Sequence, residues 1–305
     1  MGGGPDESGG SSDIVGRPAL GGMGRTPRLP HQGVAVGHHE RAWQPLLDVR
    51  LLGRFGVWTA DGTEVRFTGR HAQALFTLLA ITRRPRTREA IAADLWPDAA
   101  APATGPLRQA LYQVRHVLAD AGIGPDLVLE STQEILGLRD EALGSLDVDA
   151  FEACTDDVVC SAERAVALYR GDLAEGLGHE CFAAERERLA DRFEDALAEV
   201  ATQRFALDDL DGARRAAELL LARDPLREEA HAVLIGVHGR AGSRAQVVRQ
   251  YRRVQEVLAR ELGEAPLPET DAAYRIAMAA TVARSYERAA TLDRHAPITL
   301  AVVGS

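Results

Sequence analysis

The chain has 305 residues, of which 46% are hydrophobic and 5% aromatic, so it is long enough for about two domains with aliphatic cores. No apolar run approaches the ~18–20 residues that a membrane span needs, and the N-terminus lacks an apolar signal segment. We therefore expect a cytoplasmic protein with no membrane partner. No phosphate-loop, zinc-protease or serine-hydrolase motif occurs, so we expect no enzyme and no cofactor.

The net charge of −10 is distributed unevenly. Residues 47–140 contain 11 arginines and 11 acidic residues, whereas residues 141–290 contain 19 arginines and 29 acidic residues. Residues 70–118 hold seven arginines and three acidic residues, a local charge of +4. Such a local excess matters more for DNA contact than the total does. All 35 basic residues are arginine, which a GC-rich genome also produces, so arginine usage alone indicates nothing about nucleic acid.

The potential metal ligands form no recognisable motif. Cys154, Cys160 and Cys181 make no Cys-x-x-Cys pair and are an odd number, so we predict reduced, mostly buried thiols. The nine histidines are scattered, and the pair His38-His39 lies in an irregular stretch where solvent exposure is the simpler interpretation. We expect no metal site.

The pattern along the chain changes at Leu47. Residues 1–46 are rich in Gly, Pro, Ser and His without periodicity, which predicts a disordered tail. Short apolar runs at 47–53, 55–59 and 64–68 follow, with a hairpin turn at Asp61-Gly62, and they predict a small sheet.

Three helices and a second hairpin are predicted next. The first helix carries Ala72, Leu75, Phe76, Leu78 and Leu79 on one face. The second begins after Thr87, a good N-cap, buries Ile91 and Leu95, and ends at Pro97. The third has Pro106 in its first turn and Gly122 just past its end. A hairpin around 131–134 completes the order sheet, three helices, hairpin.

From Leu146 onward, almost every segment carries apolar residues at helical spacing. Two helix pairs repeat at about 34 residues, with Ala213 matching Val247, Ala217 matching Tyr251 and Leu220 matching Val254. This is the tetratricopeptide period. We expect this domain at 146–282 and a C-terminal extension at 283–305.

Many short motifs stand in an order that resembles the Streptomyces antibiotic regulatory protein family. They include Leu51-Leu52-Gly53, Leu95-Trp96-Pro97, Leu107-Arg108-Gln109-Ala110-Leu111, Val148-Asp149-x-Phe151, Leu168-Tyr169-Arg170-Gly171-Asp172-Leu173, Glu185-Arg186-Glu187-Arg188-Leu189, Asp224-Pro225 through His231, Gln250-Tyr251 and Glu261-Leu262-Gly263.

The resemblance covers about residues 47–280. It implies a mainly α fold, in which an OmpR-type winged helix-turn-helix (three helices, a small N-terminal sheet and a C-terminal hairpin wing) occupies residues 47–140. An all-α tetratricopeptide-like bacterial transcriptional activator domain follows. The resemblance further implies an activator of a secondary-metabolite cluster, such as an antibiotic cluster. Two copies would bind direct repeats in double-stranded DNA as a dimer and engage RNA polymerase.

The third helix is the candidate reader of DNA. Stepping 100° per residue places Leu107, Ala110, Leu111, Val114 and Leu118 on one buried stripe. The other side carries the candidate base-contacting residues, which are Arg108, Gln109, Tyr112, Gln113 and His116. Gln can pair with adenine and Arg with guanine through two contacts each. An ordinary solvated helix face is the alternative, although this face has no acidic residue between Leu107 and Ala119.

Phosphate contacts are predicted for Arg86, Thr87, Arg88 and Arg115. The first three stand where the second helix begins, and a helix N-terminus favours an anion. Thr87 could equally act only as a helix cap. The wing sequence carries Glu130 and Glu134, which would repel phosphate.

Two competing hypotheses remain open. The acidic wing favours a helical interaction scaffold whose winged helix has lost its affinity for DNA. Pro297 to Ser305 reads as an apolar strand leading to a Gly-rich phosphate loop, which favours the N-terminal part of a larger regulator that contains an NTPase.

Overall fold

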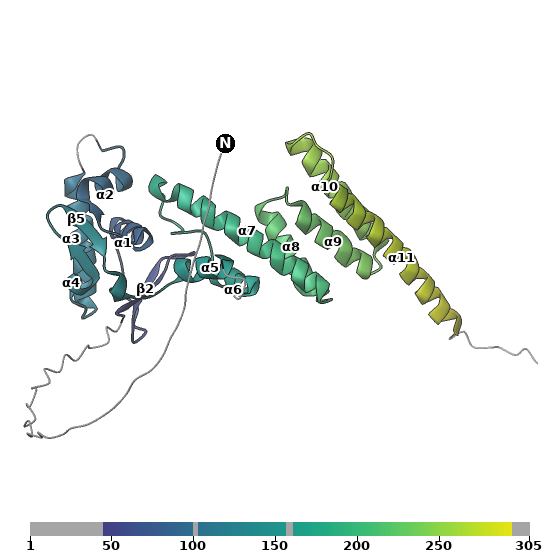
Figure 1. The fold of residues 1–305 in the computed structure, drawn as a ribbon, viewed down its shortest axis with the longest axis horizontal. Coiled ribbons are helices and arrows are strands. Elements are labelled where there is room, and N and C mark those ends of the chain that lie inside the picture. Colours follow the sequence, from purple (N-terminus) through teal and green to yellow (C-terminus); the bar gives the residue numbers. More distant parts are fainter. Residues whose placement is uncertain (1–44, 100–102, 157–160, 295–305) are drawn as a thin grey trace, which may run out of the picture. The chain divides into compact units, whose positions relative to one another are not determined.

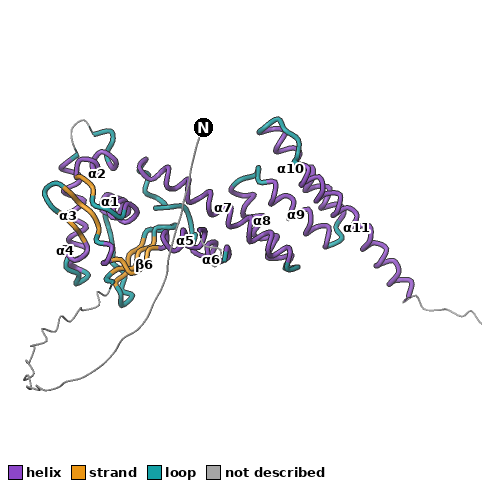
Figure 2. Tube along the Cα trace, in the orientation of Figure 1, coloured by secondary structure: helices purple, strands orange, loops and turns teal. Residues whose placement is uncertain are grey.

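The computed structural model describes residues 45–99, 103–156 and 161–294, with side chains up to residue 286. Within them the chain is mainly helical, with two small sheets followed by an all-helical region, as Figures 1 and 2 show. The segments predicted as a disordered tail (apart from residues 45–46) and as a strand at Pro297–Ser305 lie outside the described residues, as does the His38-His39 pair.

The first half of the structure contains six strands and four helices among the described residues. They are β1 (Leu47–Arg50), β2 (Gly56–Thr59), α1 (Arg70–Thr82), β3 (Arg86–Thr87), α2 (Arg88–Leu95), α3 (Thr104–Asp120), α4 (Pro125–Val128), β4 (Leu129–Ser131), β5 (Ile135–Leu138) and β6 (Leu143–Leu146). The second half is mainly helical in its described residues, apart from residues 169–179, which include an isolated bridge from Leu173 to Leu52. Its helices are α5 (Asp147–Asp156), α6 (Ala162–Leu168), α7 (Ala183–Ala206), α8 (Leu210–Arg223), α9 (Glu228–Arg240), α10 (Arg244–Glu261) and α11 (Pro268–Arg294).

The first sheet has the order β2-β1-β6. Strands β1 and β2 are antiparallel, while β1 and β6 are parallel. The predicted strand at 64–68 is wrong, because only Glu64 makes a bridge, to Trp58. The chain leaves the sheet there, since Phe67 packs against Phe55 and Phe76 (ring centroids 5.2 and 5.1 Å away). Strand β6 was not predicted, because its sequence, LGSL, is short and does not alternate.

The second sheet, β3-β5-β4, forms the wing beside the three helices. Strands β4 and β5 make the predicted hairpin, and the two residues of β3 pair with β5. Helix α1 packs on α3, and α2 packs on α3. The order sheet, three helices, hairpin is therefore confirmed, and it places α3 next to the wing.

A close backbone junction joins the first half to the helical half. The buried carboxylate of Asp147 accepts hydrogen bonds from the backbone N–H groups of Leu51 (2.7 Å) and Leu52 (3.1 Å). Burial raises the pKa of Asp147, and these two hydrogen bonds oppose that shift. The Gly53 N–H donates to the carbonyl of Asp172 (3.1 Å). One hydrophobic core runs without interruption from Leu47 to Val237.

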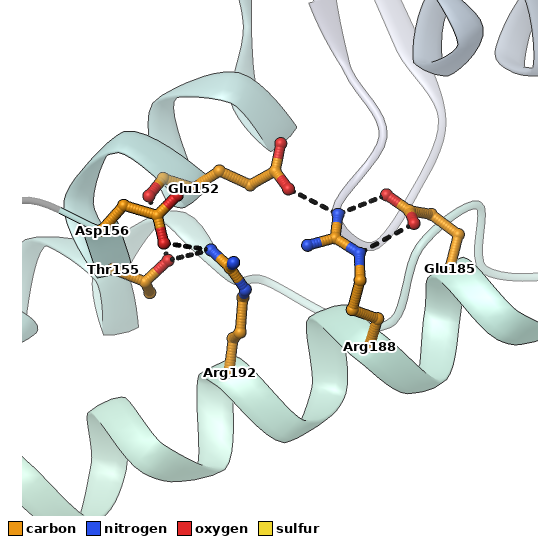
Figure 3. Close-up of polar contacts among 6 residues, drawn as sticks. All are labelled: Glu152, Thr155, Asp156, Glu185, Arg188 and Arg192. Carbon is orange, nitrogen blue, oxygen red and sulfur yellow. Dashed lines mark hydrogen bonds and ion pairs between the residues drawn. The ribbon is translucent and has the colours of Figure 1, made fainter.

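Arginines of α7 anchor that helix to α5, as Figure 3 shows. Arg188 lies between Glu152 of α5 (2.5 Å) and Glu185 (2.6 Å). One turn further on, Arg192 donates to Asp156 (2.6 Å) and to the hydroxyl of Thr155 (3.1 Å). Within the Glu185-to-Leu189 motif, Arg188 therefore holds α7 against α5, and Glu185 pairs with it.

Helices α7 to α11 pack on one another in succession. The three residue pairs matched at 34-residue spacing occupy equivalent places on α8 and α10, and all are buried except the half-buried Tyr251. A small separate cluster around Val247 forms the core between α9, α10 and α11, and another around Val254 packs against Leu226 in the loop between α8 and α9.

The thiol prediction is wrong for Cys154, which is disulfide-bonded. A disulfide depends on the distance and direction between two Cβ atoms, which spacing alone does not reveal. Cys181 is free and half-buried, and burial raises its pKa to about 11. Cys160 lies outside the described residues.

Candidate nucleic-acid interface

Helix α3 divides into a buried and an exposed side. Its buried residues are the five that the periodicity predicts, Leu107, Ala110, Leu111, Val114 and Leu118. After Asp120 the chain turns at Gly122, whose φ of +75° suits a residue without a Cβ. The opposite side faces away from the core and is available to a ligand.

Four of the five predicted base-contacting residues are exposed on that side, namely Arg108, Gln109, Tyr112 and His116. Tyr112 is 61% exposed, unusually high for a large aromatic ring. Within the described part of the chain, the side chains of Arg108 and Gln109 have no hydrogen-bond or ion-pair partner. Their donors and acceptors are therefore free for a base edge.

His116 is held by its own helix. Its Nδ1 lies 2.7 Å from the Asp120 carboxylate, one turn further on, and its ring lies 6.1 Å from that of Tyr112. The face without acidic residues therefore ends at His116, and Arg108, Gln109 and Tyr112 form its open part.

Gln113 and Arg115 are half-buried, at the border of this face. The Gln113 amide lies against Gly69, where a Cβ on that glycine would come within 2.5 Å of its Oε1. Arg115 forms an ion pair with the exposed Asp126 (3.2 Å) and keeps 37% of its side chain exposed. An exposed pair of this kind is worth ~0–1 kcal/mol, so a phosphate could displace Asp126.

The three residues before and at the start of α2 differ in their partners. Thr87 caps α2 by accepting a hydrogen bond from the backbone N–H of Ala90 (3.3 Å). Arg86 pairs with Asp94 (2.6 Å). Arg88 donates to the carbonyl of Thr132 (2.9 Å) and to the hydroxyl of Ser131 (3.0 Å), so it fixes the wing turn against α2.

A groove of about 410 Å³ lies between the starts of α2 and α3 and the wing. Arg88 and Glu89 line it from α2, Arg108 lines it from α3, and Ser131, Thr132 and Gln133 line it from the wing. Sequence reasoning missed Glu89, the three wing residues and Thr104, which also lines the groove. Their signal was weak, since a polar residue at a hairpin turn or at a helix start is common in any fold.

Among the described residues, no group of three or more His, Cys, Asp or Glu side chains could hold a metal ion. No helix in the described ranges is long and apolar enough to cross a membrane.

The fold therefore defines a winged helix joined to a helical domain, and comparison with known proteins agrees. Residues 146–276 match the family model of the bacterial transcriptional activator domain. That match covers the helical region, from the end of β6 into α11. No curated protein sequence matched the chain.

A solved structure, Mycobacterium tuberculosis EmbR in complex with a low affinity phosphopeptide, shares the fold. The TM-score is 0.64 and the identity 23%, over 82% of this chain and 71% of that chain. The likeness extends beyond the helical domain, because residues 146–276 alone could not account for this coverage.

Proposed function

We propose that this protein is a sequence-specific DNA-binding transcriptional activator in which α3 enters the major groove. The observation that carries the proposal is the exposed face of α3, on which Arg108 and Gln109 have no partner within the described residues. Residues of this type at a helix surface read guanine and adenine. Tyr112, Gln113 and His116 extend the reading surface, and Arg86, Thr87, Arg88 and Arg115 contact phosphates.

The finer proposal follows the family resemblance. Two copies bind direct repeats head to tail, with half-sites about one helical turn apart, so that both α3 helices meet the same face of the duplex. The helical domain engages RNA polymerase, and the controlled genes form a secondary-metabolite cluster such as an antibiotic cluster. The net charge of −10 over residues 141–290 supports protein contacts for this domain, because it would repel the duplex.

The direct test replaces Arg108 and Gln109 together with alanine in the full chain. We expect loss of sequence-specific binding with an unchanged melting temperature, because both side chains are exposed and each good base contact is worth ~1–3 kcal/mol. Footprinting on the chain's own upstream regions identifies the site, and mobility shifts across salt concentrations measure affinity. Arg215→Ala on α8, also an exposed arginine, is the matched control. An unchanged footprint in the double variant would exclude α3 as the reader.

A second function is favoured by one observation, since Arg86, Arg88 and Arg115 are all engaged within the protein. If these contacts persist in the presence of DNA, the winged helix is an interaction scaffold. The salt dependence of DNA affinity separates the two proposals. In a plot of the logarithm of affinity against the logarithm of salt concentration, each phosphate contact that releases a counterion makes the slope steeper by ~0.9. A flat salt dependence would favour the scaffold.

A further inference from the structure

A groove of about 340 Å³ lies on the helical domain, distant in sequence from the DNA-reading helix. Leu221 and Pro225 line it from the end of α8 and the loop that follows, while Arg253, Glu256, Val257 and Arg260 line it from α10. We call it the arginine groove. Leu221 and Val257 are buried and contribute an apolar floor, whereas the two arginines are exposed at the mouth.

The floor is held by a buried histidine. His231 Nε2 contacts the carbonyl of Pro225 (3.0 Å), and its Nδ1 contacts the amide of Gln250 (2.8 Å). With Gln250 donating to Nδ1, Nε2 carries the proton and donates to Pro225. The groove is therefore built before any ligand arrives.

The two arginines of the arginine groove differ from most arginines of the preceding helices in their ion pairs. Seven arginines between α7 and the end of α9 form ion pairs with carboxylates; they are Arg188, Arg192, Arg204, Arg214, Arg223, Arg227 and Arg240. Arg253 has no such partner in the described ranges. Arg260 meets only its neighbour Glu261 (2.9 Å), and both side chains are more than half exposed.

Helix α10 as a whole is cationic within an acidic domain. It carries five arginines and two acidic residues, whereas residues 141–290 have a net charge of −10. Charge that is left unpaired on one helix of an acidic domain favours an anionic partner.

We propose that the arginine groove binds an acidic peptide segment of a partner protein. A guanidinium binds a carboxylate through two parallel hydrogen bonds, and the apolar floor accepts a side chain between the two acids. Glu256 also lines the groove, between the two arginines in sequence, and it repels any negative group placed opposite it. A peptide can place its acidic residues at the arginines and an uncharged residue opposite Glu256, whereas a nucleic acid carries a phosphate at every nucleotide, so a protein partner fits better. This inference does not depend on the DNA contacts of α3.

The spacing of the arginines predicts the motif. Arg253 and Arg260 are seven residues apart on one helix face, about 10.5 Å along the axis. In an extended polyproline-type peptide, residues three apart share a face and lie about 9 Å apart. Two acidic residues separated by two non-acidic ones therefore match the groove.

The experiment measures binding of labelled peptides to the full chain by fluorescence anisotropy. Each ten-residue peptide carries two glutamates in an Ala, Leu and Ser background, at every spacing from one to six, and a matched set carries glutamine instead. We expect the tightest binding at a spacing of three and little binding of the glutamine set. Equal binding at all spacings, or no binding above the glutamine set, overturns the proposal.

Arginine-to-alanine variants test whether the peptide binds at the arginine groove. The double change Arg253→Ala and Arg260→Ala should weaken binding about tenfold or more, because both charge-assisted contacts are lost. Arg252→Ala removes an equally exposed arginine of α10 that does not line the groove, and it should change nothing. Circular dichroism confirms that each variant folds.

A DNA mobility shift on the same proteins completes the test. The groove double variant should bind DNA like the unmodified chain. A loss of DNA affinity as large as that of the Arg108 and Gln109 double variant would assign the groove to nucleic acid and overturn the proposal. Failure of DNA binding in the unmodified chain would count against the proposed function and leave the peptide result standing.

Discussion

His231 illustrates how a buried side chain links the fold to pH. Burial lowers its pKa from the ordinary value of 6.5, and the hydrogen bond to Pro225 only partly opposes this shift. Since the folded chain holds His231 neutral, the unfolded chain binds the proton first as pH falls. The contribution of neutral His231 to the free energy of unfolding is therefore fully present above pH 6.5. It is lost as the pH falls from 6.5 towards the lowered pKa of His231 in the folded chain.

We therefore predict that His231→Gln makes stability less dependent on pH. Glutamine can still donate to the Pro225 carbonyl but does not titrate. Urea unfolding between pH 5 and 8 should show a shallower fall below pH 6.5, by up to ~1.4 kcal/mol per pH unit for one proton. His179 and His238, whose pKa values burial also lowers, remain as an internal reference. An identical slope in both proteins would show that His231 does not cause the acid sensitivity.

Glu134 on the wing carries a negative charge that opposes the proposed DNA contact. Its side chain is exposed, while its backbone carbonyl accepts from the Arg88 N–H (2.9 Å). Glu134→Gln keeps that backbone bond and removes the negative charge. We predict tighter DNA binding at low salt, with an advantage that shrinks as salt rises.

The matched control for this wing variant is Glu269→Gln on α11, which makes the same charge change at another exposed position. Mobility shifts at three salt concentrations compare the two. If Glu134→Gln gains no more than the control, the wing does not approach the duplex.

At the scale of elements, two glycines explain how the loop after β1 and the segment before α7 come together. A Cβ on Gly171 would lie 2.9 Å from the Cα of Gly53, and one on Gly53 would lie 3.2 Å from the Arg170 carbonyl carbon. Gly53 also has a φ of +93°, a conformation that side chains disfavour. Backbone contact this close requires both glycines.

Three alanine variants separate the effect of backbone strain at positive φ from the effect of the close contact between the two backbones. Gly62→Ala introduces backbone strain alone, since its φ is +86° and nothing lies within 4 Å of the added Cβ. Gly171→Ala introduces the close contact alone, and Gly53→Ala introduces both. We predict losses of ~1–2 kcal/mol for strain and ~1–3 kcal/mol for the contact, with Gly53→Ala the most destabilised in urea unfolding. A Gly171→Ala protein as stable as the unmodified chain would show that the two backbones separate easily.

The elements also show what sequence could and could not predict. The buried stripe of α3 was predicted because a helix repeats its contacts every 3.6 residues. The partners of Arg86, Arg88 and Arg115 could not be predicted, because they depend on where the wing and α4 lie in space. The same limit applies to β6, three of whose four residues pair with a strand almost a hundred residues earlier.

At the scale of the whole molecule, the continuous core predicts cooperative unfolding. Trp58 and Trp96 report on the first half, whereas circular dichroism at the helical band reports mainly on the second. With Trp43 replaced by Phe, we predict coincident urea transitions for the two probes, because one core joins the halves. Helices α10 and α11, packed through small separate clusters, should exchange their amide hydrogens earlier. Two separate transitions would mean that the halves unfold independently.

The junction of Leu51–Gly53 with Asp172–Glu175 has a practical consequence for protein engineering. A chimaera that exchanges the DNA-reading half between two regulators would naturally be cut near residue 140, where the first domain ends in sequence. That cut separates β1 from β6, from Asp147 and from the loop whose backbone bonds Leu51 and Gly53. A transplant that keeps its native contacts must carry residues 143–147 and 169–175 together with the winged helix, because the unit of exchange is discontinuous in the chain.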